Sequence, residues 1–265
     1  ATAGGSMLLA TRQQRSSLDL SSWEAEMAER QEAPDLDAFT AALVEADLPA
    51  RVVIDASDSP DAAARHRAWL DAGIHVITNN SAALTGPMAE WAQLAGAGPH
   101  ASDVRYMYGT AYGDWLPVAS TVNTLLAAGD DVVSIDGVLS ASVSYVLNRV
   151  SSVDGTDDGE ASSLSRAMME AYNLGLFEAD PSKDLSGGHS AKQLLLLARD
   201  LGVELELSDI DVEPLLSTDG MDFSGPAAVQ ASVAAHDAAF HDRVAAARAA
   251  GCVLRYVGSV RRAEE

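Results

Sequence analysis

Two short apolar runs with a helical segment between them restrict the fold of this chain more than any other feature of its sequence. Residues 51–57 and 74–78 each hold a few apolar residues between turn formers, a pattern typical of buried strands in a parallel sheet. Residues 60–72 have the pattern of a helix, and Gly73 stands where a helix-ending glycine is expected. Strand, helix and strand at this spacing predict a βαβ unit and therefore a parallel sheet.

Further elements are predicted on both sides of this unit from periodicity and capping residues. Helices are expected at 22–45, 116–128, 163–173, 190–199 and 227–250. In the first of these a second helix starts near Pro34, and the last has an internal break. Ser186 is the expected N-cap of the helix at 190–199. Strands are expected at 105–108, 132–139, 204–207, 209–212 and 253–257.

The stretch from Gly175 to Arg199 concentrates charge next to a predicted helix start. Six ionisable residues fall within fifteen positions: Glu178, Asp180, Lys183, Asp184, His189 and Lys192. A loop that brings polar groups to a helix N-terminus is suited to hold a small charged ligand. The alternative interpretation is a solvated acidic turn before a core helix.

The residues Glu178, Asp180, Pro181, Asp184, Leu185, Ser186, Gly187 and Ala191 match the substrate loop of homoserine dehydrogenases. The stretch resembles that family, most closely the dehydrogenase half of bifunctional aspartokinase–homoserine dehydrogenases. The resemblance implies an α/β fold, with an incomplete Rossmann-like parallel sheet followed by an α+β domain of the catalytic type. It places a partial nucleotide-binding domain that lacks the glycine-rich loop at 1–130, and a catalytic or dimerisation domain shortened at its C-terminus at 131–265.

The resemblance also assigns roles to individual residues. Substrate binding falls to Glu178, Asp184, Ser142 and Tyr145, with Lys183 beside them. A residual cofactor-binding role falls to Thr78, Asn80, Ser81, Gly113 and Trp115. Some of these roles have an alternative. Thr78 to Ser81 could form only a polar loop at a strand end. Trp115 could have a purely structural role, and Lys183 could simply be exposed to solvent.

Several positions depart from the family pattern. His189 stands at the position of the family's catalytic Asp, Gln193 at that of its catalytic Lys, and Ser81 at that of a further lysine. Asp114 and Trp115 replace a small pair that leaves room for a ligand. Positions 189 and 193 lie on one helix face because they are four residues apart.

These departures predict a homoserine dehydrogenase-like protein that has lost NAD(P)-dependent hydride transfer and binds or processes a small aspartate-family amino acid. His189, with Lys192 nearby, is the candidate acid/base; alternatively His189 only caps the helix. No cofactor is then expected. The other hypotheses are a genuine NAD(P)-dependent homoserine dehydrogenase, which would bind NAD(P), and a non-catalytic scaffold or partner subunit.

Composition limits the classes of partner. A net charge of −22 and a pI of about 4.4 disfavour nucleic-acid binding. No apolar run approaches the roughly 20 residues that cross a membrane, and no signal peptide is visible. Cys252 is the single cysteine, so neither an internal disulfide nor a thiolate metal site is expected, and the histidines lack metal-ligand spacing. We expect a cytoplasmic homodimer or hetero-oligomer.

Overall fold

The computed structural model describes residues 21–22, 25, 29, 35–46, 48–96, 104–113, 116–153, 163–177 and 180–261. The chain divides into two compact units, residues 1–120 and 121–265. The division falls within α7 (Val118–Ala127). Each unit is described by itself below. None of the described helices is both long enough and apolar enough to cross a membrane.

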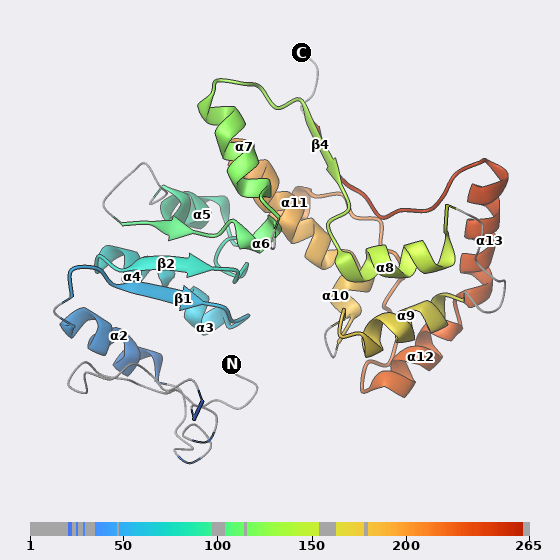
Figure 1. Ribbon diagram of the computed structural model, residues 1–265, viewed down its shortest axis with the longest axis horizontal. Helices are drawn as coiled ribbons and strands as arrows, with labels where there is room; N and C mark the ends of the chain where they lie inside the picture. Colours follow the sequence, from blue (N-terminus) through green and yellow to red (C-terminus); the bar gives the residue numbers. More distant parts are fainter. Residues whose placement is uncertain are drawn as a thin grey trace. The chain divides into compact units, whose positions relative to one another are not determined.

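The first unit contains the predicted parallel sheet (Figure 1). Its strands β1 (Val52–Asp55), β2 (His75–Thr78) and β3 (Tyr106–Met107) are hydrogen-bonded in that order. Val52 to Asp55 pair in parallel with His75 to Thr78, and Val76 and Ile77 pair with Tyr106 and Met107. The α/β class predicted from the two apolar runs is therefore confirmed.

The helices of this unit match the predicted ones in part: the helix expected at 60–72 is divided, and two short helices at 88–95 and 110–113 were not predicted. After α2 (Leu36–Glu45), which Asp35 caps through its side chain, the helix expected at 60–72 forms two pieces, α3 (Pro60–Ala63) and α4 (His66–Asp71). Gly73 follows α4 with a φ of 73°, as expected of a helix-ending glycine. α5 (Met88–Ala95) and α6 (Thr110–Gly113) complete the unit.

The expectation that residues 51–57 and 74–78 form buried strands holds for one face of each strand. In β1, Val53 and Asp55 are buried, whereas Val52 is 49% and Ile54 72% exposed. β2 alternates in the same way. A continuous apolar run does not reveal whether other elements cover both faces of a sheet, and here only one face of each strand is buried.

The second unit is built on four helices around an apolar core: α8 (Ala141–Val150), α9 (Leu164–Asn173), α12 (Pro226–Ala234) and α13 (Asp237–Ala249). α9 packs against α8 and α12. The predicted helix at 227–250 does break, at Ala235 and His236. Gly175 follows α9 with a φ of 72°, as predicted.

A two-stranded antiparallel sheet completes this unit. β4 (Ser134–Gly137) lies within the predicted strand 132–139, but its partner β5 (Gly258–Arg261) begins after the predicted strand 253–257. Neither 204–207 nor 209–212 is a strand; the 3-10 helix η2 (Leu207–Asp209) lies there. The Asp209 side chain accepts a hydrogen bond from the backbone of Glu206 at 2.8 Å, and such local bonds compete with strand pairing.

The segment that carries the candidate site forms two helices. α10 (Ser182–Leu185) occupies part of the region expected to be a loop, and α11 (Gly188–Asp200) follows it. Ser186 is not the N-cap of the longer helix: it ends α10, and Gly187 is the N-cap of α11.

Candidate functional site

In the second unit, the carboxylate of Asp184 lies against two serines of α8's N-terminus. Asp184 is 9% exposed. Its Oδ1 atom accepts hydrogen bonds from Ser140 Oγ at 3.3 Å and Ser142 Oγ at 3.2 Å, and the two hydroxyls are 2.9 Å apart. No hydrogen bond or ion pair engages Oδ2 among the residues that the structure describes. A buried carboxylate with one free oxygen can accept a hydrogen bond from a cationic ligand.

Local structure explains why these groups meet. Ser140 caps α8, since its Oγ accepts from the backbone N–H of Val143 at 3.2 Å. The Asp180 side chain accepts from the backbone N–H of Ser182 at 2.9 Å just before α10 begins. That backbone bond and the Ser182 hydroxyl lower the pKa of Asp180. Asp184 then lies inside α10, where a short helix fixes its direction.

Gly187 makes the turn between α10 and α11. Its φ is 79°, in the left-handed region that favours glycine. A Cβ atom there would collide with the hydroxyl of Tyr256 and would lie 2.8 Å from Val212 Cγ1. The hydroxyl of Tyr256 donates to the backbone oxygen of Glu213 at 2.9 Å, so it is held in place. Steric constraints therefore explain why position 187 keeps the glycine of the family's substrate loop.

His189 lies at the start of α11 beside Asp184. Its Nδ1 atom is 3.5 Å from Asp184 Oδ1, and its side chain is 35% exposed. The alternative that His189 caps α11 is not observed, because the N-cap is Gly187. An imidazole whose Nδ1–H faces a carboxylate presents Nε2 as an acceptor in its neutral form.

Gln193 lies one turn further along α11. Its Oε1 atom is buried and has no hydrogen-bond partner among the described residues. Residues four apart on a helix share a face, so Gln193 and His189 point to the same side of α11. An unpaired buried acceptor is rare in folded proteins and calls for an explanation.

Three further predicted substrate-site residues that the structure describes, Lys183, Lys192 and Tyr145, are not joined to this cluster. Lys183 is exposed on α10 and Lys192 partly exposed on α11. Tyr145 is partly buried and packs against the apolar core. No hydrogen bond or ion pair links any of these three to Asp184 in the described part of the chain. Glu178, Asp114 and Trp115 lie outside the described residues.

The largest cavity described for this unit lies elsewhere. Its volume is about 410 Å³, and its walls include Gly187, Ser190, Arg243 and Tyr256. Neither Asp184 nor His189 lines it. The polar cluster rather than the cavity volume therefore identifies the candidate site.

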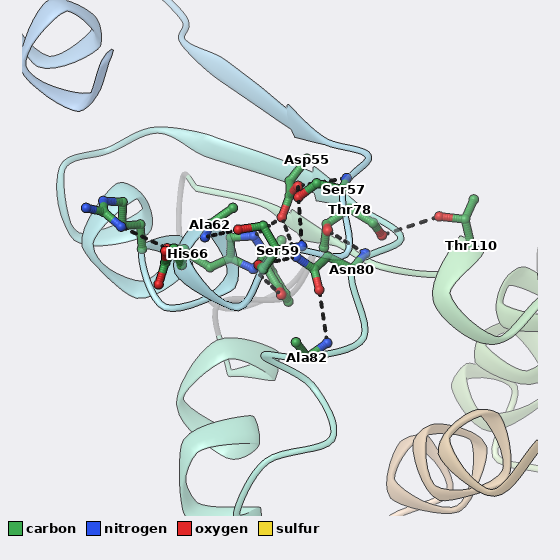
Figure 2. Close-up of polar contacts among 12 residues, drawn as sticks. Asp55, Ser57, Ser59, Ala62, His66, Thr78, Asn80, Ala82 and Thr110 are labelled. Atoms are coloured by element: carbon green, nitrogen blue, oxygen red, sulfur yellow. Dashed lines mark hydrogen bonds and ion pairs between the residues drawn. The ribbon is translucent and has the colours of Figure 1, made fainter. Parts of the chain in front are cut away.

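The first unit contains a second buried cluster, centred on Asp55 at the carboxyl end of β1 (Figure 2). Asp55 Oδ2 lies 2.8 Å from His66 Nε2 and accepts from Asn80 Nδ2 at 3.0 Å. Asp55 Oδ1 accepts from Ser57 Oγ at 2.6 Å. His66 Nδ1 is 2.9 Å from the hydroxyl of Tyr106. Sequence reasoning missed this cluster, although an acidic residue at the end of an apolar strand needs partners if it is buried.

The charge of Asp55 is stabilised in place. Burial opposes its ionisation, but hydrogen bonds from His66, Ser57 and Asn80 outweigh that effect and lower its pKa to about 2. Burial, together with the negative charge of Asp55, raises the pKa of Tyr106. Neutral His66 satisfies the geometry by donating from Nε2 to Asp55 and accepting at Nδ1 from Tyr106.

Two of the residues predicted to line a dinucleotide site are buried at the carboxyl end of β2. Thr78 and Asn80 are 1% and 2% exposed. Asn80 donates to Asp55 and to the backbone oxygen of Ser59, and its Oδ1 accepts from Ala82 N at 3.1 Å. The Asn80 amide is therefore engaged within the protein, and Thr78 Oγ1 accepts from the backbone N–H of Asn80 at 2.8 Å. The described residues also contain no group of three or more His, Cys, Asp or Glu that could hold a metal.

Gly113 and Ser81 complete the described part of that predicted set. Gly113 is buried in α6, and a Cβ there would lie 3.3 Å from Val118 Cβ. The backbone oxygen of Ser81 accepts from Leu84 N and Thr85 N. Gly113 thus faces protein rather than open space.

Family profiles match most of the chain. The profile for homoserine dehydrogenase matches residues 117–264. The profile described as homoserine dehydrogenase, NAD binding domain, matches residues 6–108.

Curated relatives agree with these profiles. The bifunctional aspartokinase/homoserine dehydrogenase of Haemophilus influenzae is 33% identical over 243 residues, which cover 92% of this chain and 29% of that protein. A chloroplastic bifunctional aspartokinase/homoserine dehydrogenase of Zea mays is 33% identical over 260 residues, or 98% of this chain and 27% of that protein. The chain thus spans less than a third of the length of these two relatives.

Solved structures share the fold. A Candida auris protein of unknown function superposes with a TM-score of 0.79 at 26% identity, covering 97% of this chain and 70% of that one. A putative homoserine dehydrogenase from Archaeoglobus fulgidus gives a TM-score of 0.68 at 24% identity, with 98% and 69% coverage. These likenesses show the fold, and the homoserine dehydrogenase profile, which matches more than half of the chain, shows that the chain belongs to the homoserine dehydrogenase family.

Proposed function

We propose that the second unit binds a small aspartate-family amino acid at Asp184, and that NAD(P)-dependent hydride transfer to or from this ligand has been lost. The observation that carries the proposal is the position of His189, whose Nδ1 atom is 3.5 Å from Asp184 Oδ1. His189, which stands at the position of the family's catalytic Asp, is therefore next to Asp184, the carboxylate expected to bind the substrate.

Amino-acid binding is supported by the surroundings of Asp184. Among the described residues, the hydroxyls of Ser140 and Ser142 hold the carboxylate through its Oδ1 atom. The resemblance gives Asp184 and Glu178 the role of binding the substrate's ammonium group. Charge-assisted hydrogen bonds of this kind are roughly twice as strong as neutral ones.

Loss of hydride transfer is supported by the residues that would handle the proton and the developing charge. Oxidation of an alcohol to an aldehyde needs a base for the hydroxyl proton and positive charge near the new carbonyl oxygen. NAD(P), when bound, supplies the hydride acceptor. Gln193 and Ser81 stand where the family has lysines, and neutral side chains cannot provide that positive charge.

The alternative is a genuine homoserine dehydrogenase that interconverts homoserine and aspartate semialdehyde. The match of residues 6–108 to the NAD-binding profile favours it, as does 33% identity to bifunctional enzymes that carry this activity in their names. Under this alternative His189 replaces the acidic residue as the acid/base, and NAD(P) is the cofactor.

The test is homoserine-dependent reduction of NAD⁺ and NADP⁺ by the full chain and by a triple variant, Ser81→Lys/His189→Asp/Gln193→Lys. We expect no turnover above background from the unaltered chain. If the three replaced side chains alone account for the loss, the triple variant should gain activity, since each acid–base group contributes about 10²–10⁴-fold; if NAD(P) binding is lost as well, the variant should stay inactive with both nucleotides. Adding Asp184→Asn to the variant should remove that activity if it uses this site. Turnover by the unaltered chain equal to that of the variant would contradict the proposal.

A further inference from the structure

We propose that the cavity beside the first turn of α11 binds a small carboxylate with a short apolar chain, at a site distinct from Asp184. All residues that line this cavity of about 410 Å³ belong to the second unit. Gly187, Ser190 and Ala191 bring the start of α11 into its wall, whereas Asp184 and His189 do not line it. The proposal is therefore independent of amino-acid binding at Asp184.

The first support is Arg255, a residue of the cavity wall whose charge has no acidic partner among the described residues. It is half-buried, and its Nη1 atom donates to the backbone oxygens of Ser151 at 2.9 Å and Leu254 at 2.6 Å. The chain has 39 acidic side chains against 17 Lys and Arg, so an arginine without an ion pair is unexpected. A guanidinium has five N–H donors, and those that the two backbone oxygens do not use are available to an anion.

The second support is the first turn of α11. Its N-cap is Gly187, which supplies no side-chain hydrogen bond to the turn. The N–H groups of a first helical turn carry partial positive charge and favour an anion. Ser190 in the same turn is only 8% exposed and lines the cavity, and no hydrogen bond engages its hydroxyl in the described part of the chain. A carboxylate in the cavity supplies the acceptor that this hydroxyl lacks.

Two acidic residues of the wall oppose an anion, and their position limits that effect. Asp211 and Glu213 are both exposed, so water screens their charges. Glu213 Oε1 lies 3.5 Å from Nη2 of Arg243, another residue of the wall, and the Glu213 side chain is 84% exposed. Arg243 therefore offsets Glu213, and Arg255 is the cation left for a ligand.

The apolar part of the wall sets the rest of the ligand's chemistry. It is formed by Leu147, Val212, Leu215 and Phe240, among others. Small-molecule sites are typically mostly apolar cavities of roughly 300–1,000 Å³ with a few polar groups that fix orientation. A short branched aliphatic chain can occupy the apolar part while its carboxylate meets Arg255 and Ser190.

The test is saturation-transfer nuclear magnetic resonance on the full chain with isovalerate and isovaleramide, which share one carbon skeleton and differ in charge. Isovalerate should bind saturably and at least about tenfold more tightly than the amide, because hydrogen bonds between charged groups are the stronger ones. Arg255→Gln should weaken isovalerate binding about tenfold, and Ser190→Ala, which removes only a hydroxyl, about threefold.

Two control variants should leave isovalerate binding unchanged: Arg166→Gln, at an exposed arginine of α9 outside the cavity wall, and Asp184→Asn. Three results would overturn the proposal: no saturable binding of isovalerate, equal binding of the acid and the amide, or unchanged affinity in Arg255→Gln. If Arg255→Gln fails to fold by circular dichroism, the acid–amide comparison and Ser190→Ala still decide. None of these outcomes depends on whether homoserine binds at Asp184.

Discussion

Each unit of this protein contains a buried aspartate with a histidine and serine hydroxyls around it, and the two clusters differ in how completely the aspartate is satisfied. Asp55 has close partners on both oxygens, with His66 at 2.8 Å and Ser57 at 2.6 Å. Asp184 has its partners on one oxygen, at 3.2 to 3.5 Å. His66 is fully buried, whereas the side chain of His189 is 35% exposed.

The comparison separates a structural use of these residue types from a binding use. A fully satisfied buried network rigidifies a fold, because each polar group depends on the others. A carboxylate with a free oxygen beside a half-exposed histidine has capacity left for a ligand. The clusters should therefore respond in opposite ways: loss of Asp55's partners should reduce stability, and loss of Asp184's partners should reduce binding.

The largest expected effect is on the stability of the first unit. His66→Leu should lower its free energy of unfolding by about 3–5 kcal/mol, because it leaves the charge of Asp55 buried with fewer partners. All four tryptophans, at 23, 69, 91 and 115, precede residue 121, so denaturation followed by tryptophan fluorescence reports on this unit. The matched variant His189→Leu should change stability by less than about 1 kcal/mol. Equal losses of unfolding free energy in the two variants would contradict the distinction between a structural Asp55 cluster and a ligand-binding Asp184 cluster.

The next effect concerns the turn that positions α11. Gly187→Ala should destabilise the second unit by about 2–4 kcal/mol, since it combines a left-handed backbone with a collision against Tyr256. Gly175→Ala is the control, because it has the same backbone strain with no atom within 4 Å of the new Cβ. It should lose only about 1–2 kcal/mol. Denaturation followed by far-ultraviolet circular dichroism measures both, and equal losses would mean that Tyr256 moves aside.

A smaller effect should appear in acid. The folded-state pKa of Asp55 is about 2, below its ordinary 3.8. Its charge therefore stabilises the first unit fully above about pH 4, and this contribution is lost as the pH falls from about 4 towards 2. The loss should reach at most about 2 kcal/mol. Fluorescence-detected denaturation at a series of pH values measures it, and Asp55→Asn should remove this part of the pH dependence.

Part of the fold could be predicted from the sequence, and the features that could not be predicted have physical causes. The strands near 52 and 75 follow from apolar runs, and the match at Gly187 from the substrate-loop pattern. The Asp55 cluster was not predicted, because only the pairing of the three strands brings together Asp55, Asn80 and Tyr106. The strands predicted at 204–212 were wrong because Asp209 bonds the local backbone and Arg199 donates to the backbone oxygen of Leu205 at 2.8 Å.

The candidate site shows the same limit. The resemblance named Ser142, Asp184 and His189, which the structure brings together. It gave no indication that Ser140 would share the carboxylate of Asp184, because an N-cap serine is recognised only once the start of α8 is known. Nor could it show that Gln193 Oε1 is buried without a partner.

Calorimetric titration of homoserine into the full chain without nicotinamide nucleotide, beside Asp184→Asn, tests amino-acid binding most directly. We predict a saturable heat for the unaltered chain and an affinity about 10–100-fold weaker for the variant, because a charge-assisted hydrogen bond to the ammonium group is lost. The absence of binding by the unaltered chain, or the same affinity in both proteins, would contradict the assignment of Asp184 as the ligand-binding carboxylate.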